Sequence, residues 1–169
     1  IHIDAPITKY DIVAGLPNAG GGSWATQSSL FYYENDNSWL PPYIMETTSD
    51  RKAMNPDILV LKGGDVNGDG KGDFAAIIGY GMVTGGGTKI DNVVPVIYIN
   101  SGSGFFKVTL PQLGTTDPGD IHIDLGNVDQ DDDMDLVVSY DKNVYLYRND
   151  GAWTKTTIAS GLSDIKGVT

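Results

Sequence analysis

The chain has 169 residues, of which 40% are hydrophobic and 20% charged, and this balance argues against a disordered chain. Its 11 basic and 22 acidic residues give a formal charge of −11, so we expect no nucleic acid partner, because phosphate backbones are also negative. The absence of cysteine excludes disulfides and thiolate metal sites, and no apolar stretch has the length of a membrane helix, so we expect no membrane insertion.

Short strand-like segments follow one another along the whole chain. Each is rich in Val, Ile and Tyr and is bounded by turn-forming residues, and none has a sustained 3.6-residue apolar period. We therefore expect an all-β fold with few helices. In chain order the segments are "KYDIVAG" (9–15), "LFYYENDNSW" (30–39), "PDILVLKGG" (56–64), "DFAAIIGY" (73–80), "VIYINSGSGFF" (96–106), "GDIHIDLGN" (119–127), "DLVVSY" (135–140) and "VYLYRNDGAW" (144–153).

The segments form a repeat. The Asp that precedes an apolar strand recurs at Asp11, Asp73 and Asp135, at two intervals of 62 residues. The repeating unit is a strand, an acidic loop, a strand, a variable loop, a strand, a tight turn and a strand. We predict one repeat domain over 1–169, with units at 1–55, 56–118 and 119–169.

Four short antiparallel strands in each unit predict a β-propeller blade, although a stacked β-sandwich also fits the pattern. The chain holds nearly three units, and three blades do not close a ring. We therefore expect self-association, or further blades in a longer polypeptide, and an initial Ile1 is consistent with a processed or partial chain.

The first acidic loop, "DVNGDGKGD" at 65–73, places oxygen-bearing side chains at alternate positions. Carboxylates this close repel one another unless a cation lies among them, and calcium prefers about six to eight oxygen ligands. Gly70 allows a sharp turn, but an apolar strand follows where an EF-hand would have a helix. The predicted ligands are the side chains of Asp65, Asn67, Asp69 and Asp73 and the backbone carbonyl of Lys71.

The second acidic loop repeats this arrangement with more charge. Asp132 replaces the turn glycine, and the first unit keeps only Asp4 and Asp11, so we expect no metal there. We predict about two Ca²⁺ ions with a structural role; magnesium fits less well, because it retains several waters. The alternative is that these Asp and Asn side chains only bond their own backbone as turn formers. The predicted ligands of the second loop are Asn127, Asp129, Asp131, Asp133 and Asp135.

The loop pattern D-x-[ND]-x-D-G-x-x-D-[FL], together with the turn pattern Y-x-N-x-G-x-[FW], resembles the FG-GAP and VCBS families of calcium-binding repeats. The resemblance covers nearly the whole chain. It implies a propeller of several blades, commonly about seven, outside the cell, with adhesion, glycan binding or scaffolding as its work. The degenerate first loop and the 62-residue repeat depart from that pattern.

Two long insertions, 15–29 and 79–94, are candidate binding loops on a rigid β scaffold. In the first, Trp24 could stack on a sugar ring while Asn18, Gln27 and Ser28 bond hydroxyl groups; the alternative is a flexible loop with Trp24 packed on a neighbouring blade. The aromatic residues at the repeated turn are expected to seal one blade against the next. They are Trp39, Phe106 and Trp153.

No catalytic constellation can be assembled from the sequence. The two histidines, His2 and His122, both lie in the strand-like segment "IHID", and no nucleophile elbow, zinc-protease or phosphate-loop motif is present. We therefore predict a non-catalytic extracellular module that recognises glycans or proteins, or that assembles with itself. The alternative is the propeller portion of a secreted polysaccharide-acting enzyme.

Overall fold

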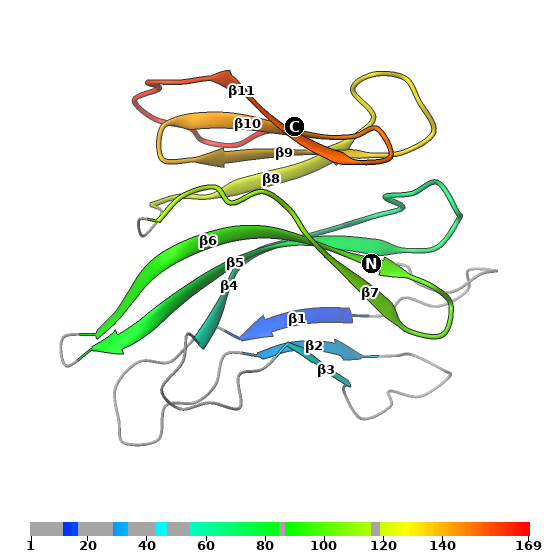
Figure 1. Ribbon diagram of the computed structural model, residues 1–169, viewed down its shortest axis with the longest axis horizontal. Helices are drawn as coiled ribbons and strands as arrows, with labels where there is room; N and C mark the ends of the chain where they lie inside the picture. The colour runs from blue at the N-terminus through cyan, green and yellow to red at the C-terminus, as the bar shows by residue number, and fades with distance from the viewer. Residues whose placement is uncertain (1–11, 17–28, 34–42, 47–54, 85–86, 116–118) are drawn as a thin grey trace.

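The computed structural model describes residues 12–16, 29–33, 43–46, 55–84, 87–115 and 119–169 (Figure 1). These residues form three antiparallel sheets, and no helix among them could cross a membrane. The first sheet holds β1 (Ile12–Leu16), β2 (Ser29–Tyr33) and β3 (Tyr43–Glu46). The second holds β4 (Asn55–Gly64), β5 (Asp73–Thr84), β6 (Gly87–Asn100) and β7 (Phe105–Thr109), and the third holds β8 (His122–Gly126), β9 (Asp135–Tyr140), β10 (Asn143–Asn149) and β11 (Trp153–Ala159).

Each sheet is a meander in which consecutive strands pair. The second and third sheets each have four strands, which confirms the all-β prediction and the four-stranded antiparallel unit. Within the described residues the first sheet has three strands. Figure 1 shows the sheets stacked in one direction, with the third above the second and the first below it.

Two buried clusters hold the stack together. The upper cluster lies between the second and third sheets and includes Ala75, Ile77, Leu136 and Val138; the lower cluster lies between the first and second sheets and includes Leu30 and Phe74. Alternate residues of β5 therefore point into different clusters, which explains the continuous apolar run "DFAAIIGY".

The connection that leads from β7 to β8 is fastened to the upper cluster by two side chains of the third sheet. The fully buried Tyr147 donates a hydrogen bond from its hydroxyl to the carbonyl of Pro111 over 2.7 Å. Lys155 donates to the carbonyl of Gln112, also over 2.7 Å, with its Nζ 4.1 Å from the ring centre of Tyr145. These contacts fix the third sheet relative to the connection.

We expect Tyr147→Phe to lower the free energy of unfolding by about 1 kcal/mol at neutral pH, because the Pro111 carbonyl loses its donor. Burial raises the pKa of Tyr147 above its ordinary value of 10.0. The stability that Tyr147 contributes is therefore fully present below pH 10.0 and is lost as the pH rises beyond it, because the phenol ionises in the unfolded chain before it ionises in the folded one. Urea unfolding should show that the free energy of unfolding differs less between Tyr147→Phe and wild type at about pH 11 than at pH 7. A difference that does not change with pH would contradict this account.

The second predicted insertion is not a loop. Residues 79–94 extend β5 and β6 into one long hairpin, paired as far as Thr84 and Gly87. The sequence suggested a loop because of its glycines, but Gly79 stands where a neighbour approaches closely: a Cβ there would lie 3.0 Å from the Ile90 side chain. The first insertion lies outside the described residues except at its ends, 15–16 and 29.

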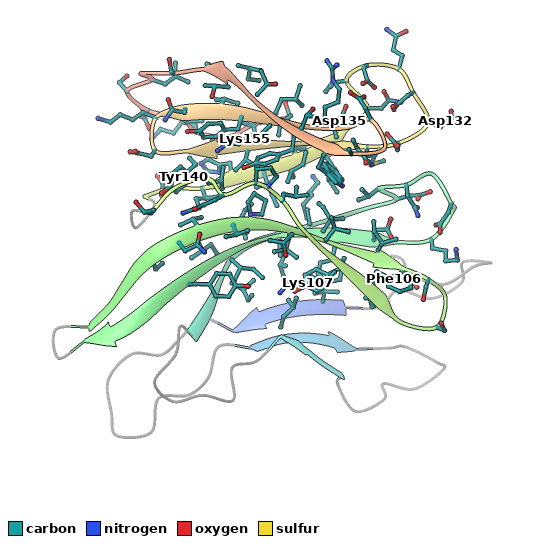
Figure 2. The ribbon with its side chains drawn as sticks, viewed as in Figure 1. Phe106, Lys107, Asp132, Asp135, Tyr140 and Lys155 are labelled. Carbon is teal, nitrogen blue, oxygen red and sulfur yellow. The ribbon has the colours of Figure 1, made fainter. Side chains whose placement is uncertain are left out.

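Of the three aromatic residues expected to seal the sheets, one is placed as predicted. Trp153 pairs with Asn149 and packs against the upper cluster. The prediction for Phe106 is wrong: its side chain is 65% exposed (Figure 2), and Phe105, which pairs with Asn100, packs on the lower cluster in its place. The longer turn after Asn100 shifts the register by one residue, and this reverses the face. Trp39 lies outside the described part of the chain.

Candidate metal centre

The two acidic loops lie at the same end of the stack. The backbone N–H of Met134, in the second loop, donates to the carbonyl of Val66, in the first, over 2.9 Å. The side-chain amide of Asn149 donates to the same carbonyl over 3.2 Å. Figure 1 shows the β4–β5 and β8–β9 connections one above the other at this end. The sequence repeat therefore corresponds to a spatial repeat, with acidic loops in neighbouring sheets joined by hydrogen bonds.

The last carboxylate of each loop is buried and joins three parts of its sheet. Asp73 is 0% exposed, and its two oxygens accept the N–H groups of Val66, over 2.9 Å, and Asn100, over 2.7 Å. Burial raises the pKa of the Asp73 carboxyl, although these two hydrogen bonds act in the opposite direction. The carboxylate thus ties the start of the loop to the end of the third strand.

Asp135 does the same in the third sheet. It is also 0% exposed, and its oxygens accept the N–H groups of Val128, over 3.0 Å, and Asn149, over 2.9 Å. The Asp at the start of the second strand and the Asn at the end of the third strand are therefore partners in both sheets. This is the physical reason for their repetition in the sequence.

The other acids of the first loop bond within the loop. Asp65 accepts the N–H groups of Asp69 and Gly70, over 3.1 and 2.9 Å, and Asn67 accepts that of Asp69 over 3.2 Å. Lys71 lies 2.7 Å from Asp69, and this hydrogen bond lowers the pKa of the Asp69 carboxyl. This is the turn-forming arrangement expected as the alternative to metal binding. An ionised carboxylate has further lone pairs, so the turn bonds leave room for a cation.

The second loop brings acids together more closely. Asp129, Asp131 and Asp150 each place one oxygen within 4.8 Å of the others. Asp150 comes from the turn between β10 and β11 and follows Asn149 directly, so the cluster joins two connections of the third sheet. Two further oxygens, Oδ1 of Asp129 and Oδ1 of Asp133, are buried and accept no hydrogen bond from the described groups. Such oxygens are unfavourable unless a cation or water reaches them.

The pKa shifts in this cluster have the cause expected for crowded carboxylates. Loss of solvation, and then the hydrogen-bonded Asp131, raise the pKa of Asp133. Loss of solvation and the hydrogen-bonded Asp129 likewise raise the pKa of Asp150. Both shifts mean that the folded loop disfavours its own negative charge, which is the electrostatic condition that a bound cation relieves.

Arg148 supplies positive charge at the edge of the cluster. Its Nε lies 3.5 Å from Asp129, and one of its terminal nitrogens lies 3.7 Å from Asp150. Both distances are longer than a good hydrogen bond, and the side chain is 46% exposed. Arg148 therefore compensates the three carboxylates only in part, and a divalent ion would compete with it for Asp129 and Asp150.

The structure brings together only some of the predicted ligands. Asp129 and Asp131 share the cluster, whereas Asn127 uses its amide within the loop: it donates to the Asp131 carbonyl, and its Oδ1 accepts the N–H of Gln130 over 2.6 Å. Asp150 was not predicted. The signal that could have identified it is its place in the repeated turn, one residue after the Asn that contacts the buried Asp.

The turn geometry differs between the loops. The first has positive φ at Gly68 (68°) and Gly70 (81°), so the predicted turn glycine is used. In the second loop the positive φ falls on Gln130 (69°), which matches Gly68, and not on Asp132. Asp132 is exposed (Figure 2) and forms neither the turn nor the cluster.

The remaining predicted site residues are not brought to this cluster. The predicted sugar-binding residues Trp24, Asn18, Gln27 and Ser28 lie outside the described residues. His122 is a half-buried strand residue of β8, and its backbone N–H donates to the Ser139 hydroxyl over 3.0 Å.

Comparisons with known proteins give no match for this chain, whether with protein-family models, with curated proteins or with solved structures. The resemblance to FG-GAP and VCBS repeats therefore stays a prediction that depends on the two motifs.

Proposed function

We propose that this chain is a non-catalytic, calcium-binding module, that its stacked sheets are blades of a β-propeller, and that it recognises a glycan or protein outside the cell. The observation that carries the proposal is the carboxylate cluster of Asp129, Asp131 and Asp150, together with the buried Oδ1 of Asp129, which accepts no hydrogen bond from the described groups. Two equivalent acidic loops at one end of the stack support a role in holding neighbouring blades together.

Calcium fits the donor set better than other common ions. The cluster offers carboxylate oxygens from two connections and neither imidazole nor thiolate, which are the usual zinc ligands. The residues that would hold the ion are Asp129, Asp131 and Asp150, with Asp133 as a further oxygen donor. A bound ion would offset part of the loop's negative charge and fasten the β10–β11 turn to the β8–β9 connection.

The first test is calcium titration by calorimetry after treatment with a chelator. We expect uptake by the wild type, and a melting temperature raised by about 5 to 10 °C, because a ligand at 100 times its Kd adds about 2.7 kcal/mol to the folded state. The double variant Asp129→Asn and Asp131→Asn should lose both effects. Asp141→Asn removes one charge from the β9–β10 turn and serves as a control for the loss of surface charge outside the cluster. Absence of uptake by the wild type would disprove the metal assignment.

A second test uses Arg148. If a cation competes with this guanidinium, Arg148→Gln should tighten calcium binding about tenfold, since one nearby positive charge is removed. Calorimetry would measure the change, with Lys142→Gln, in the β9–β10 turn, as a charge-matched control. A cluster that serves only as a surface ion-pair network would respond differently: Arg148→Gln would leave calcium binding unchanged.

Recognition itself is tested on glycan arrays and on extracellular matrix proteins, with calcium and with chelator. We expect binding that is lost in the chelator, because the ion stabilises the loops that present the surface. Incubation with the bound polysaccharide should give no depolymerisation. If the polysaccharide is depolymerised and a single substitution abolishes that activity, the proposal of a non-catalytic recognition module is wrong and the chain is part of an enzyme.

A further inference from the structure

The first acidic loop contains the one place in the sequence where a glycine directly follows an asparagine, at Asn67 and Gly68. Glycine has no Cβ, so its backbone nitrogen can approach the preceding side-chain amide, an approach that a larger residue would obstruct. Asn67 is exposed in the connection between β4 and β5. The loop therefore places a nucleophilic nitrogen next to a carbonyl carbon that it can attack without a catalyst.

The turn that Asn67 forms favours this reaction. Its Oδ1 accepts the N–H of Asp69 over 3.2 Å, and this bond folds the side chain back over the peptide that joins Asn67 to Gly68. The carbonyl carbon of the side chain is thereby held beside the nitrogen of Gly68, which reduces the entropy that ring closure costs. The same N–H, which is shared with Asp65 over 3.1 Å, points at the oxygen on which negative charge develops during the attack.

The backbone nitrogen of Gly68 is not held by another bond. No described group accepts its N–H, whereas the neighbouring N–H groups of Val66, Asp69 and Gly70 all donate to carboxylates of the loop. Gly68 has a φ of 68°, a conformation that glycine adopts without strain. Attack by this nitrogen therefore breaks none of the hydrogen bonds that shape the loop.

Two other asparagines of the sheet ends lack this combination. Asn100 also accepts an N–H two residues further along, but it is buried, and the N–H of Ser101 donates to a carbonyl within the turn over 2.8 Å. Asn127 is exposed, but the N–H of Val128 donates to the buried Asp135 over 3.0 Å. In both places the nitrogen that would attack is bound, and the residue that carries it has a Cβ.

We propose that Asn67 is a site of spontaneous modification, at which the chain converts its own asparagine into a carboxylate. The nitrogen of Gly68 gives its proton to solvent and bonds to Cγ of Asn67. The bond from Cγ to the side-chain nitrogen then breaks, and ammonia leaves after taking up a proton from solvent. Water opens the resulting five-membered imide at either of its two carbonyl carbons, which gives an aspartate or its β-linked isomer. Water is the only reagent consumed.

The conversion changes the first loop as a calcium site, and this consequence rests on the proposed function. An aspartate in place of Asn67 gives the loop carboxylates at its first, third and fifth positions, and calcium affinity rises with the charge of the ligands. The β-linked isomer instead adds one carbon to the main chain beside Gly68, where a Cβ would already lie 2.5 Å from the carbonyl oxygen of Asp132. One product strengthens the site, and the other disturbs the contact between the two acidic loops.

Peptide mapping by mass spectrometry tests the modification itself. The 169-residue chain is incubated with chelator in mildly alkaline buffer, folded and, in parallel, unfolded in guanidinium chloride. In the folded chain we expect Asn67 to convert at least about tenfold faster than Asn100 and Asn127, and within about tenfold of its own rate in the unfolded chain. Asn67→Gln is the matched control and should stay intact, because its longer side chain closes a larger ring. A smaller preference for Asn67, or a fold that protects it beyond that limit, would overturn the proposal.

Calcium titration of Asn67→Asp gives the second readout, in the Asp129→Asn and Asp131→Asn background that removes the second loop's cluster. We expect this variant to bind calcium about tenfold more tightly than the same background with Asn67 intact, because it adds a charged ligand. Equal affinities would overturn the consequence for the first loop. Conversion of Asn67 without calcium uptake by any variant would disprove the metal assignment alone, and calcium uptake without conversion would overturn the modification alone.

Discussion

Asp135→Asn is expected to lower the free energy of unfolding by about 3 to 5 kcal/mol, with the protein held in chelator so that no metal contributes. The carboxylate of Asp135 is 0% exposed and accepts two backbone N–H groups, those of Val128 and Asn149. Asparagine has one oxygen, so its NH₂ group must face a backbone donor. One N–H is left without an acceptor in a buried place, which is the costly arrangement.

Urea unfolding followed by circular dichroism measures the effect, and the melting temperature should fall by about 10 °C or more. Asp132→Asn is the matched control, because it removes the same charge from the same loop at an exposed position. We expect it to be neutral within about 0.5 kcal/mol. Equal losses for the two variants would mean that charge in the loop, and not the buried hydrogen bonds, determines the stability.

The sequence predicted the all-β class and the four-stranded antiparallel unit because its main signal was a repeat. Asp73 and Asp135 recur with their partners Asn100 and Asn149, and the structure explains why: each Asp holds the N–H of its Asn. A contact that both four-stranded sheets need leaves the same two residue types at equivalent positions in their sequences. The strands around it are short, rich in Val, Ile and Tyr and bounded by turn-forming residues, so both the all-β class and the four-stranded unit followed from local pattern.

The candidate site was predicted only in part, since spacing along one loop does not say where each oxygen points. Asn127 and Asp129 are both in the predicted ligand series, yet Asn127 bonds its own loop while Asp129 joins the cluster. Asp150 is 15 residues away from Asp135 in the sequence and reaches the cluster only because β10 returns the chain to the same end. No short motif contains that contact. It depends on the pairing of whole strands.

The errors at Phe106 and in the second insertion have separate physical origins. At Phe106 the length of the turn was left out of the register, whereas in the second insertion the glycines were interpreted as loop signals. One additional residue in the turn after Asn100 moves Phe105 onto the covered face and Phe106 onto the exposed one. Close packing against Ile90 favours a glycine at Gly79 inside a strand, so that glycine marks a tight contact and not flexibility.

Gly68→Ala is expected to cost about 3 kcal/mol, against about 1 kcal/mol for Gly70→Ala. Both glycines have positive φ, 68° and 81°, so both substitutions strain the backbone in the same way. They differ in their surroundings. A Cβ on Gly68 would lie 2.5 Å from the backbone carbonyl oxygen of Asp132, whereas a Cβ on Gly70 would meet nothing within 4 Å. The difference between the two variants therefore measures the contact between the first and second acidic loops.

The same pair separates the loop contact from the metal site. Because Asp132 stands between Asp131 and Asp133, a displacement of its backbone by Gly68→Ala should also weaken calcium binding, by about tenfold on the proposal above. Gly70→Ala changes only the first loop and should leave the affinity of the second unaltered. Urea unfolding in chelator and calcium calorimetry give the two readouts. If both alanine variants lose the same stability, the loops do not press on each other, and the stacking of the second and third sheets at this end would have to be revised.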